Sequence, residues 1–151
     1  MADEDKSFID GINPSPEEIR NILQKSKKIA IVGLSPKESR PSNMVARYLK
    51  EHGFEIVPVN PGQKEILGEK CYRSIADIPF DVDIADLFLN ARRVPDAVEQ
   101  ALDKGVKVIW MQLGIYHLEA GEKASSSGAT VIMDSCIKTE HEKMSNPLAT
   151  I

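Results

Sequence analysis

Cysteine is scarce in this sequence. Only Cys71 and Cys136 occur among its 151 residues, and they do not stand at a spacing typical of metal ligands. Two cysteines are too few for a disulfide-stabilised scaffold, and without that spacing they predict no zinc site. The first interpretation of each is therefore a buried, inert thiol.

Long apolar runs and an excess of one charge are missing as well. No apolar run approaches the roughly 20 residues that a membrane-spanning helix needs. The formal net charge is −4 with both signs mixed along the chain, so no basic stripe marks a nucleic-acid partner. The acidic segment Met1–Asp5 differs from a secretory signal or a transit peptide. We expect a cytoplasmic protein without nucleic-acid or membrane partners.

Apolar patterning divides the rest of the chain into alternating strands and helices. It predicts helices over 15–25, 41–52, 94–104 and 117–127, and main strands over 28–32, 54–60, 82–89, 106–111 and 130–133. Such alternation produces right-handed crossovers and a parallel sheet. The predicted fold is α/β and Rossmann-like, with a doubly wound, mostly parallel five-stranded sheet in three α/β/α layers. Pro58 counts against a central position for the second strand.

The length is that of one domain, able to bury roughly two-thirds of its unfolded surface. Residues 1–13 are acidic and have no sustained periodicity, so we expect a mobile arm there. A single domain is predicted over 14–146, followed by a tail at 147–151.

The loop after the first strand is the strongest indication of a ligand. The apolar run 28–32 ends at Gly33, and a polar, basic loop precedes Pro41, which opens an amphipathic helix. A helix N-terminus at such a crossover favours an anion. The loop has only the first glycine of G-x-G-x-x-G and is no Walker A loop. Asn60 stands where an NAD site would carry an acid, which argues against a usual NAD site.

Side chains at the carboxyl ends of the predicted strands should share one edge of the sheet. They are rich in cations, amides and hydroxyls and poor in general acids and bases, which favours a phosphorylated ligand. The residues at these positions are Gly33, Ser35, Lys37, Arg40, Ser42, Asn60, Pro61, Lys64, Phe88, Asn90, Arg92, Arg93, Gln112, Gly114, Cys136 and Lys138. No histidine stands in a triad arrangement, and Asp86 is interpreted as structural or solvated.

Five ordered motifs over about residues 16–143 resemble the small, single-domain coenzyme-A-binding proteins. Their fold is similar to the coenzyme-A-binding domain of the succinyl-CoA synthetase α subunit. The motifs are IVGLSP with RPS (31–36, 40–42), PVNP (58–61), ILGEKCY (66–72), WMQLG (110–114) and MDSCIK (133–138). In two places the sequence departs from the family: Leu89 and Ser135 stand where members often have arginine.

The resemblance implies that coenzyme A (CoA) or an acyl-CoA is the small-molecule ligand, bound across the first crossover. Gly33, Ser35, Arg40 and Ser42 would hold its phosphates and pantetheine, and Asn60 and Pro61 would line the second loop. Phe88 and Asn90 belong to a loop that would meet the adenosine end or close the cleft. Gln112 and Cys136 complete the implied set at the last two strands.

Several functions stay open from the sequence. The leading hypothesis is a CoA-binding protein whose Cys136 forms a reversible mixed disulfide with CoA, against the alternative of a packed, unreactive thiol. A second is an acyl-CoA enzyme with an unrecognised catalytic group, for which His117 is the best candidate. A third is a regulatory or ligand-binding subunit that docks on a CoA ligase-like complex. The sequence does not distinguish a protein partner from a homo-oligomer.

Overall fold

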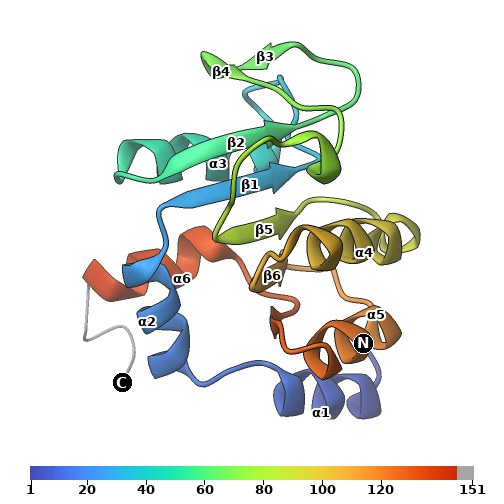
Figure 1. The fold of residues 1–151 in the computed structure, drawn as a ribbon. Coiled ribbons are helices and arrows are strands. Elements are labelled where there is room, and N and C mark those ends of the chain that lie inside the picture. The colour runs from blue at the N-terminus through green and yellow to red at the C-terminus, as the bar shows by residue number, and fades with distance from the viewer. Residues whose placement is uncertain (146–151) are drawn as a thin grey trace.

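The computed structural model describes residues 1–145 and forms one five-stranded parallel sheet (Figure 1). Its strand order is β2-β1-β5-β6-β7, with bounds β1 Lys28–Val32, β2 Glu55–Val59, β5 Ile84–Leu87, β6 Val108–Met111 and β7 Thr130–Ile132. A small antiparallel pair, β3 (Glu65–Ile66) and β4 (Glu69–Lys70), lies beside β2. The predicted sheet is confirmed; the predicted tail at 147–151 lies outside the described residues.

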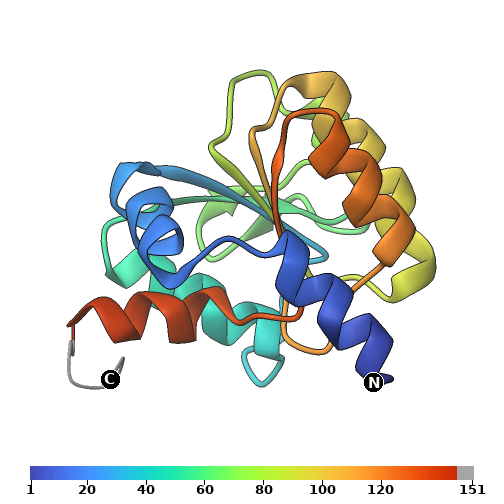
Figure 2. The same ribbon diagram turned by 90° about the horizontal axis from the view of Figure 1, so that it is seen from below.

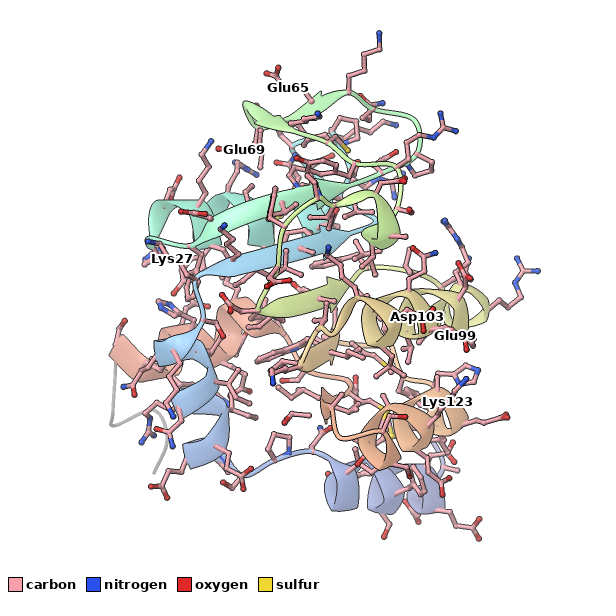
Figure 3. All side chains as sticks on the ribbon, viewed as in Figure 1. Lys27, Glu65, Glu69, Glu99, Asp103 and Lys123 are labelled. Carbon is pink, nitrogen blue, oxygen red and sulfur yellow. The ribbon has the colours of Figure 1, made fainter. Side chains whose placement is uncertain are left out.

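Helices cover both faces of the sheet (Figure 2). One face carries α1 (Asp3–Ile12), α4 (Val94–Lys104) and α5 (Leu118–Ser126), and the other carries α2 (Pro16–Lys25), α3 (Pro41–Glu51) and α6 (Ile137–Ser145). Short 3₁₀ turns at Ile75–Asp77 and Ala91–Arg93 complete the elements. On the first face, Lys123 of α5 and Glu99 of α4 form an exposed ion pair at 3.0 Å (Figure 3).

The strands read as nearly continuous apolar runs because both of their faces are buried. In β1, Ala30 and Val32 pack under α4 and α5, whereas Ile29 and Ile31 pack under α2 and α3. Alternate side chains of one strand therefore belong to two separate cores. The three-layer architecture expected from the sequence is confirmed.

Pro58 is tolerated because β2 lies at the edge of the sheet. Its carbonyl accepts a hydrogen bond from the Tyr72 amide on the outer side, and a strand residue presents its nitrogen to the same side as its carbonyl. The proline ring therefore removes no hydrogen bond between β2 and β1.

The first residues of the chain differ from the mobile arm that the sequence indicated at 1–13. They form α1, which buries Ile9 against the core beside α5. The Asn13 amide then exchanges two hydrogen bonds with the Met133 backbone, at 2.9 and 2.7 Å. Packing of one apolar side chain and two long-range hydrogen bonds hold a helix that local periodicity did not indicate. No helix within residues 1–145 combines the length and apolar character required to cross a membrane.

The order of the strands reverses between β1 and β5. The chain passes from β1 outward to β2, then returns to β5 on the other side of β1. At this switch point Gly33 follows β1 with a φ of +87°, and a Cβ there would lie 2.2 Å from the Phe88 carbonyl oxygen. The loops after β1 and β5 can approach this closely only because residue 33 has no side chain.

The Gly33→Ala variant should be destabilised by about 2–5 kcal/mol, because a left-handed φ and a backbone clash each add a cost. Gly105→Ala is the matched control: its φ is +83°, yet its Cβ would meet nothing within 4 Å. We expect it to lose only about 1 kcal/mol. Urea unfolding of the two variants and the natural protein measures both losses of unfolding free energy. Equal losses would show that the contact with Phe88 adds nothing.

Candidate ligand-binding site

Two cavities open at the carboxyl ends of the strands and meet at the switch point. The first, the arginine cavity, has a volume of about 500 Å³ and is lined by Arg73, Arg92 and Arg93 among others. The second, the thiol cavity, has a volume of about 610 Å³ and contains Cys136 in its wall. Both are lined by Gly33, Phe88 and Leu89. Each volume lies in the range of small-molecule sites.

Three guanidinium groups dominate the arginine cavity. Arg92 and Arg93 end the 3₁₀ turn before α4, and Arg73 follows the residue that bridges to β2. Asp96, in the first turn of α4, is the acid in this wall. Arginine can bind phosphate oxygens through two parallel hydrogen bonds, so this donor set suits a phosphorylated ligand.

Hydrogen bonds fix the loop after β1 in place. Ser42 Oγ accepts from the Ser35 amide at 3.0 Å, and Asn43 Nδ2 donates to the Ser35 carbonyl at 2.8 Å. Asn60 Nδ2 donates to the Leu34 carbonyl at 2.9 Å. Ser42 and Asn60 thus shape this loop as well as line the cavities. Asn43, which the sequence interpretation missed, is buried in α3 and shares this role.

The thiol cavity has a cationic rim and apolar walls. Lys37 and Arg40 stand at the rim, and the first residues of α3 line it through Pro41 and Ser42. No side chain among residues 1–145 caps the N-terminus of α3, so its amide groups place a partial positive charge there.

Cys136 is half-buried in the wall of the thiol cavity, directly before α6. The buried Gln112 fixes the start of that helix, since its Oε1 accepts from the Ile137 amide at 3.1 Å. Trp110 Nε1 donates to the Ser135 carbonyl at 2.8 Å. Two residues at the end of β6 therefore position the thiol.

Asp86 lies at the middle of the sheet and is fully buried. Neither carboxyl oxygen has a hydrogen-bond partner among residues 1–145. Burial raises the pKa of this carboxyl well above its usual value, and the charge of Cys136 adds to the shift. Of the two roles that the sequence left open for Asp86, structural or solvated, the solvated one is wrong, because Asp86 occupies a strand whose side chains are all buried.

The structure brings together the ten residues nominated from the sequence. Gly33 and Phe88 line both cavities; Asn60, Pro61 and Asn90 line the arginine cavity; Ser35, Arg40, Ser42, Gln112 and Cys136 line the thiol cavity. Their contact with a ligand stays a prediction. Arg73 was missed, because it follows an irregular segment without a strand pattern.

Other candidates lie elsewhere. His117 lines neither cavity, and its Nδ1 accepts from the Ala120 amide at 3.0 Å, capping α5. Lys138 pairs with Glu142 at 3.7 Å. Within residues 1–145, no group of three or more histidine, cysteine or acidic residues is arranged to hold a metal ion.

Comparison with known proteins assigns the family. A model described as CoA binding domain matches residues 27–142. The chain belongs to this CoA-binding-domain family. It is 43% identical over 129 residues to the uncharacterized protein YneT of Bacillus subtilis, covering 85% of this chain and 96% of that protein. A solved hypothetical protein from Pyrococcus horikoshii OT3 superimposes with a TM-score of 0.85 and 44% identity, covering 88% and 94% of the two chains.

The chain is also similar to one part of larger enzymes. The chain is 40% identical over 83 residues to acetate–CoA ligase [ADP-forming] II of Archaeoglobus fulgidus. The match covers 54% of this chain and 12% of the ligase. The similarity is therefore to one part of that enzyme.

Asp86→Asn tests the buried carboxyl through the pH dependence of stability. Because the pKa of Asp86 is raised on folding, the native state keeps a proton that the unfolded state releases above about pH 3.9. The natural protein should lose stability as the pH rises from there toward the raised pKa, by at most about 1.4 kcal/mol per pH unit. The variant, which has no proton to lose, should lack this decline. Urea unfolding at several pH values checks it, and parallel curves would contradict it.

Proposed function

We propose that this protein binds coenzyme A across the two cavities and holds it reversibly as a mixed disulfide with Cys136. The observation that carries the proposal is the meeting of an arginine-lined cavity and a cysteine-containing cavity at Gly33 and Phe88. CoA has the matching polarity, with phosphates and adenosine at one end and a thiol at the other.

The arginine cavity is the proposed site of the nucleotide end. Arg73, Arg92 and Arg93 supply guanidinium groups for phosphate oxygens, while Asn60 and Asn90 offer amides to the ribose and base. The N-terminus of α3 and Arg40, at the neighbouring rim, add positive charge where the phosphates would pass from one cavity to the other.

The thiol cavity is the proposed site of pantetheine. Leu89, Leu113 and Ile115 give it apolar walls, which suit an arm of methyl, methylene and amide groups. The Gln112 side chain offers an amide to the arm near Cys136. A ligand thiol at this end would lie beside the Cys136 sulfur.

Cys136 is better placed for exchange than Cys71. Cys71 is 8% exposed, and burial raises the pKa of its thiol. Cys136 is more accessible and stands directly before α6, at the end of that helix which carries a partial positive charge. In the proposed exchange the Cys136 thiolate bonds to one sulfur of a CoA disulfide, and the other sulfur leaves as a thiol after taking a proton.

The cationic side chains should decide affinity for CoA but not for pantetheine, which lacks the nucleotide and its phosphates. We expect Arg92→Ala and Arg40→Ala each to weaken CoA binding by roughly ten- to a hundredfold, as loss of a charged hydrogen bond does. Arg20→Ala, on α2 outside both cavities, is the control. Calorimetric titration with CoA, pantetheine and NAD measures each affinity. Binding of NAD without CoA would overturn the proposal.

The covalent bond should depend on Cys136 alone. Native mass spectrometry after incubation with CoA disulfide should show one CoA attached to the natural protein and to Cys71→Ser, removable by reductant. Cys136→Ser should bind CoA noncovalently and form no covalent adduct. A CoA adduct on Cys136→Ser would refute this assignment.

A second candidate function is a CoA-binding subunit that docks on a ligase-like partner. It is supported by the similarity to one part of an ADP-forming acetate–CoA ligase. Size-exclusion chromatography of the protein with a candidate ligase subunit, with and without CoA, separates this function from CoA binding alone.

A further inference from the structure

Asp86 points toward the face of the sheet that carries Cys136. Its neighbours Ala85 and Leu87 belong to the core under α4 and α5, so the alternation of a strand turns Asp86 to the opposite face. There Ile84 packs in the same core as Cys136, below α3 and α6. Trp110, which pairs with Asp86 in the register, donates to the carbonyl of Ser135, the residue before Cys136, at 2.8 Å. The charge of Cys136 accordingly acts on the carboxyl.

This carboxyl has no structural role that accounts for its burial. It donates and accepts no hydrogen bond among residues 1–145, although a buried polar group normally has a partner. In the register, Asp86 stands between Ile31 of β1 and Trp110 of β6, both apolar on this face. A leucine of similar size would fill the position at lower cost.

Cys136 is the titratable group that acts on Asp86. Of the other ionisable groups on the elements that pack over this face, Tyr48 of α3 bonds to His141 of α6 at 2.8 Å. Lys37 and Arg40 stand at the exposed rim. The buried acid and the half-buried thiol thus lie on the same face of the sheet, on either side of Trp110.

We propose that Asp86 is the proton acceptor and donor for Cys136 during its exchange with disulfides. The proposal rests on the mixed disulfide proposed above and adds the group that moves the proton. The proton passes after rotation of the thiol or through one water molecule.

The exchange balances as follows. Asp86 and Cys136 share one proton: when it is on the sulfur, Cys136 Sγ–H gives it to the Asp86 carboxylate, and the thiolate then forms a bond to one sulfur of a CoA disulfide. The disulfide bond breaks, and its electron pair leaves with the other sulfur, which takes up a proton from solvent. In the reverse direction an incoming thiol attacks the mixed disulfide, and the Asp86 carboxylic acid returns its proton to the departing Cys136 sulfur.

The burial of Asp86 suits this transfer. A carboxyl with an ordinary pKa near 3.9 is too weak a base for a thiol whose ordinary value is about 8.5. Desolvation raises the pKa of Asp86 well above that ordinary value, which makes its carboxylate a stronger base than an exposed one.

The test compares Asp86→Asn with Asp83→Asn, both in a Cys71→Ser background. Asp83 is the matched control because it precedes the same strand but accepts from the Lys27 and Lys28 amides at the opposite end. Two rates are measured on each protein. One is release of CoA from the preformed mixed disulfide by an added thiol, and the other is alkylation of free Cys136 by iodoacetamide.

We expect Asp86→Asn to slow release by roughly 100-fold, the lower end of general acid–base contributions. Alkylation, which needs only the thiolate, should stay equal or become faster because the neighbouring negative charge is gone. Asp83→Asn should change neither rate. Unchanged release would overturn the relay, and a parallel fall of both rates would show that Asp86 only positions the thiol.

A second measurement uses the natural protein, so that the proposal can still be tested if Asp86→Asn fails to fold. The carboxyl carbon of ¹³C-labelled Asp86 should titrate at a lower pH after Cys136 is alkylated, because the alkylated sulfur carries no charge. An unchanged titration would overturn the pairing. If the natural protein binds CoA but forms no adduct, the mixed disulfide and the relay both fail while CoA binding stands. If adducts form and release equally in both proteins, the relay alone fails.

Discussion

The contact between Gly33 and the Phe88 carbonyl is the constraint on which the site depends. It joins the loops after β1 and β5 at the point where the strand order reverses, and a Cβ at residue 33 would lie 2.2 Å from that oxygen. Both cavities share this contact as their common wall. The absence of a side chain at residue 33 is therefore needed first for the packing of the two loops. The close approach of a ligand comes second.

The polar side chains near this contact fall into two groups: some hold the loop in shape, and others line the cavities, where they can bind a ligand. The side chains of Ser42, Asn43 and Asn60 form hydrogen bonds with the backbone of residues 34 and 35. The guanidinium groups of Arg73, Arg92 and Arg93 instead line their cavity from loops and a 3₁₀ turn. A rigid amide scaffold that carries flexible cations can orient a ligand's phosphates without losing the shape of the loop.

The sequence predicted the sheet, its crossovers and the ten lining residues because their signals are local. Buried parallel strands are unbroken apolar runs, and the residues that follow them must share one edge. Helix α1 was missed because its stability comes from Ile9 and Asn13 contacting segments over a hundred residues away. Asp86 was misjudged for a similar reason: a single acid in a strand pattern does not reveal whether tertiary packing leaves it a partner.

Helix α6 packs over part of the face of the sheet to which Asp86 points. Cys136 stands directly before the first turn of this helix. Its middle is held to α3 by the Tyr48–His141 hydrogen bond, and His52 stacks on Tyr48 with ring centroids 3.9 Å apart. Burial, then the neighbouring His52, lowers the pKa of His141, so this ring favours the neutral form that can pack there. Because one helix fixes both the thiol and the cover over the acid, the spacing of the pair depends on how α6 docks on α3.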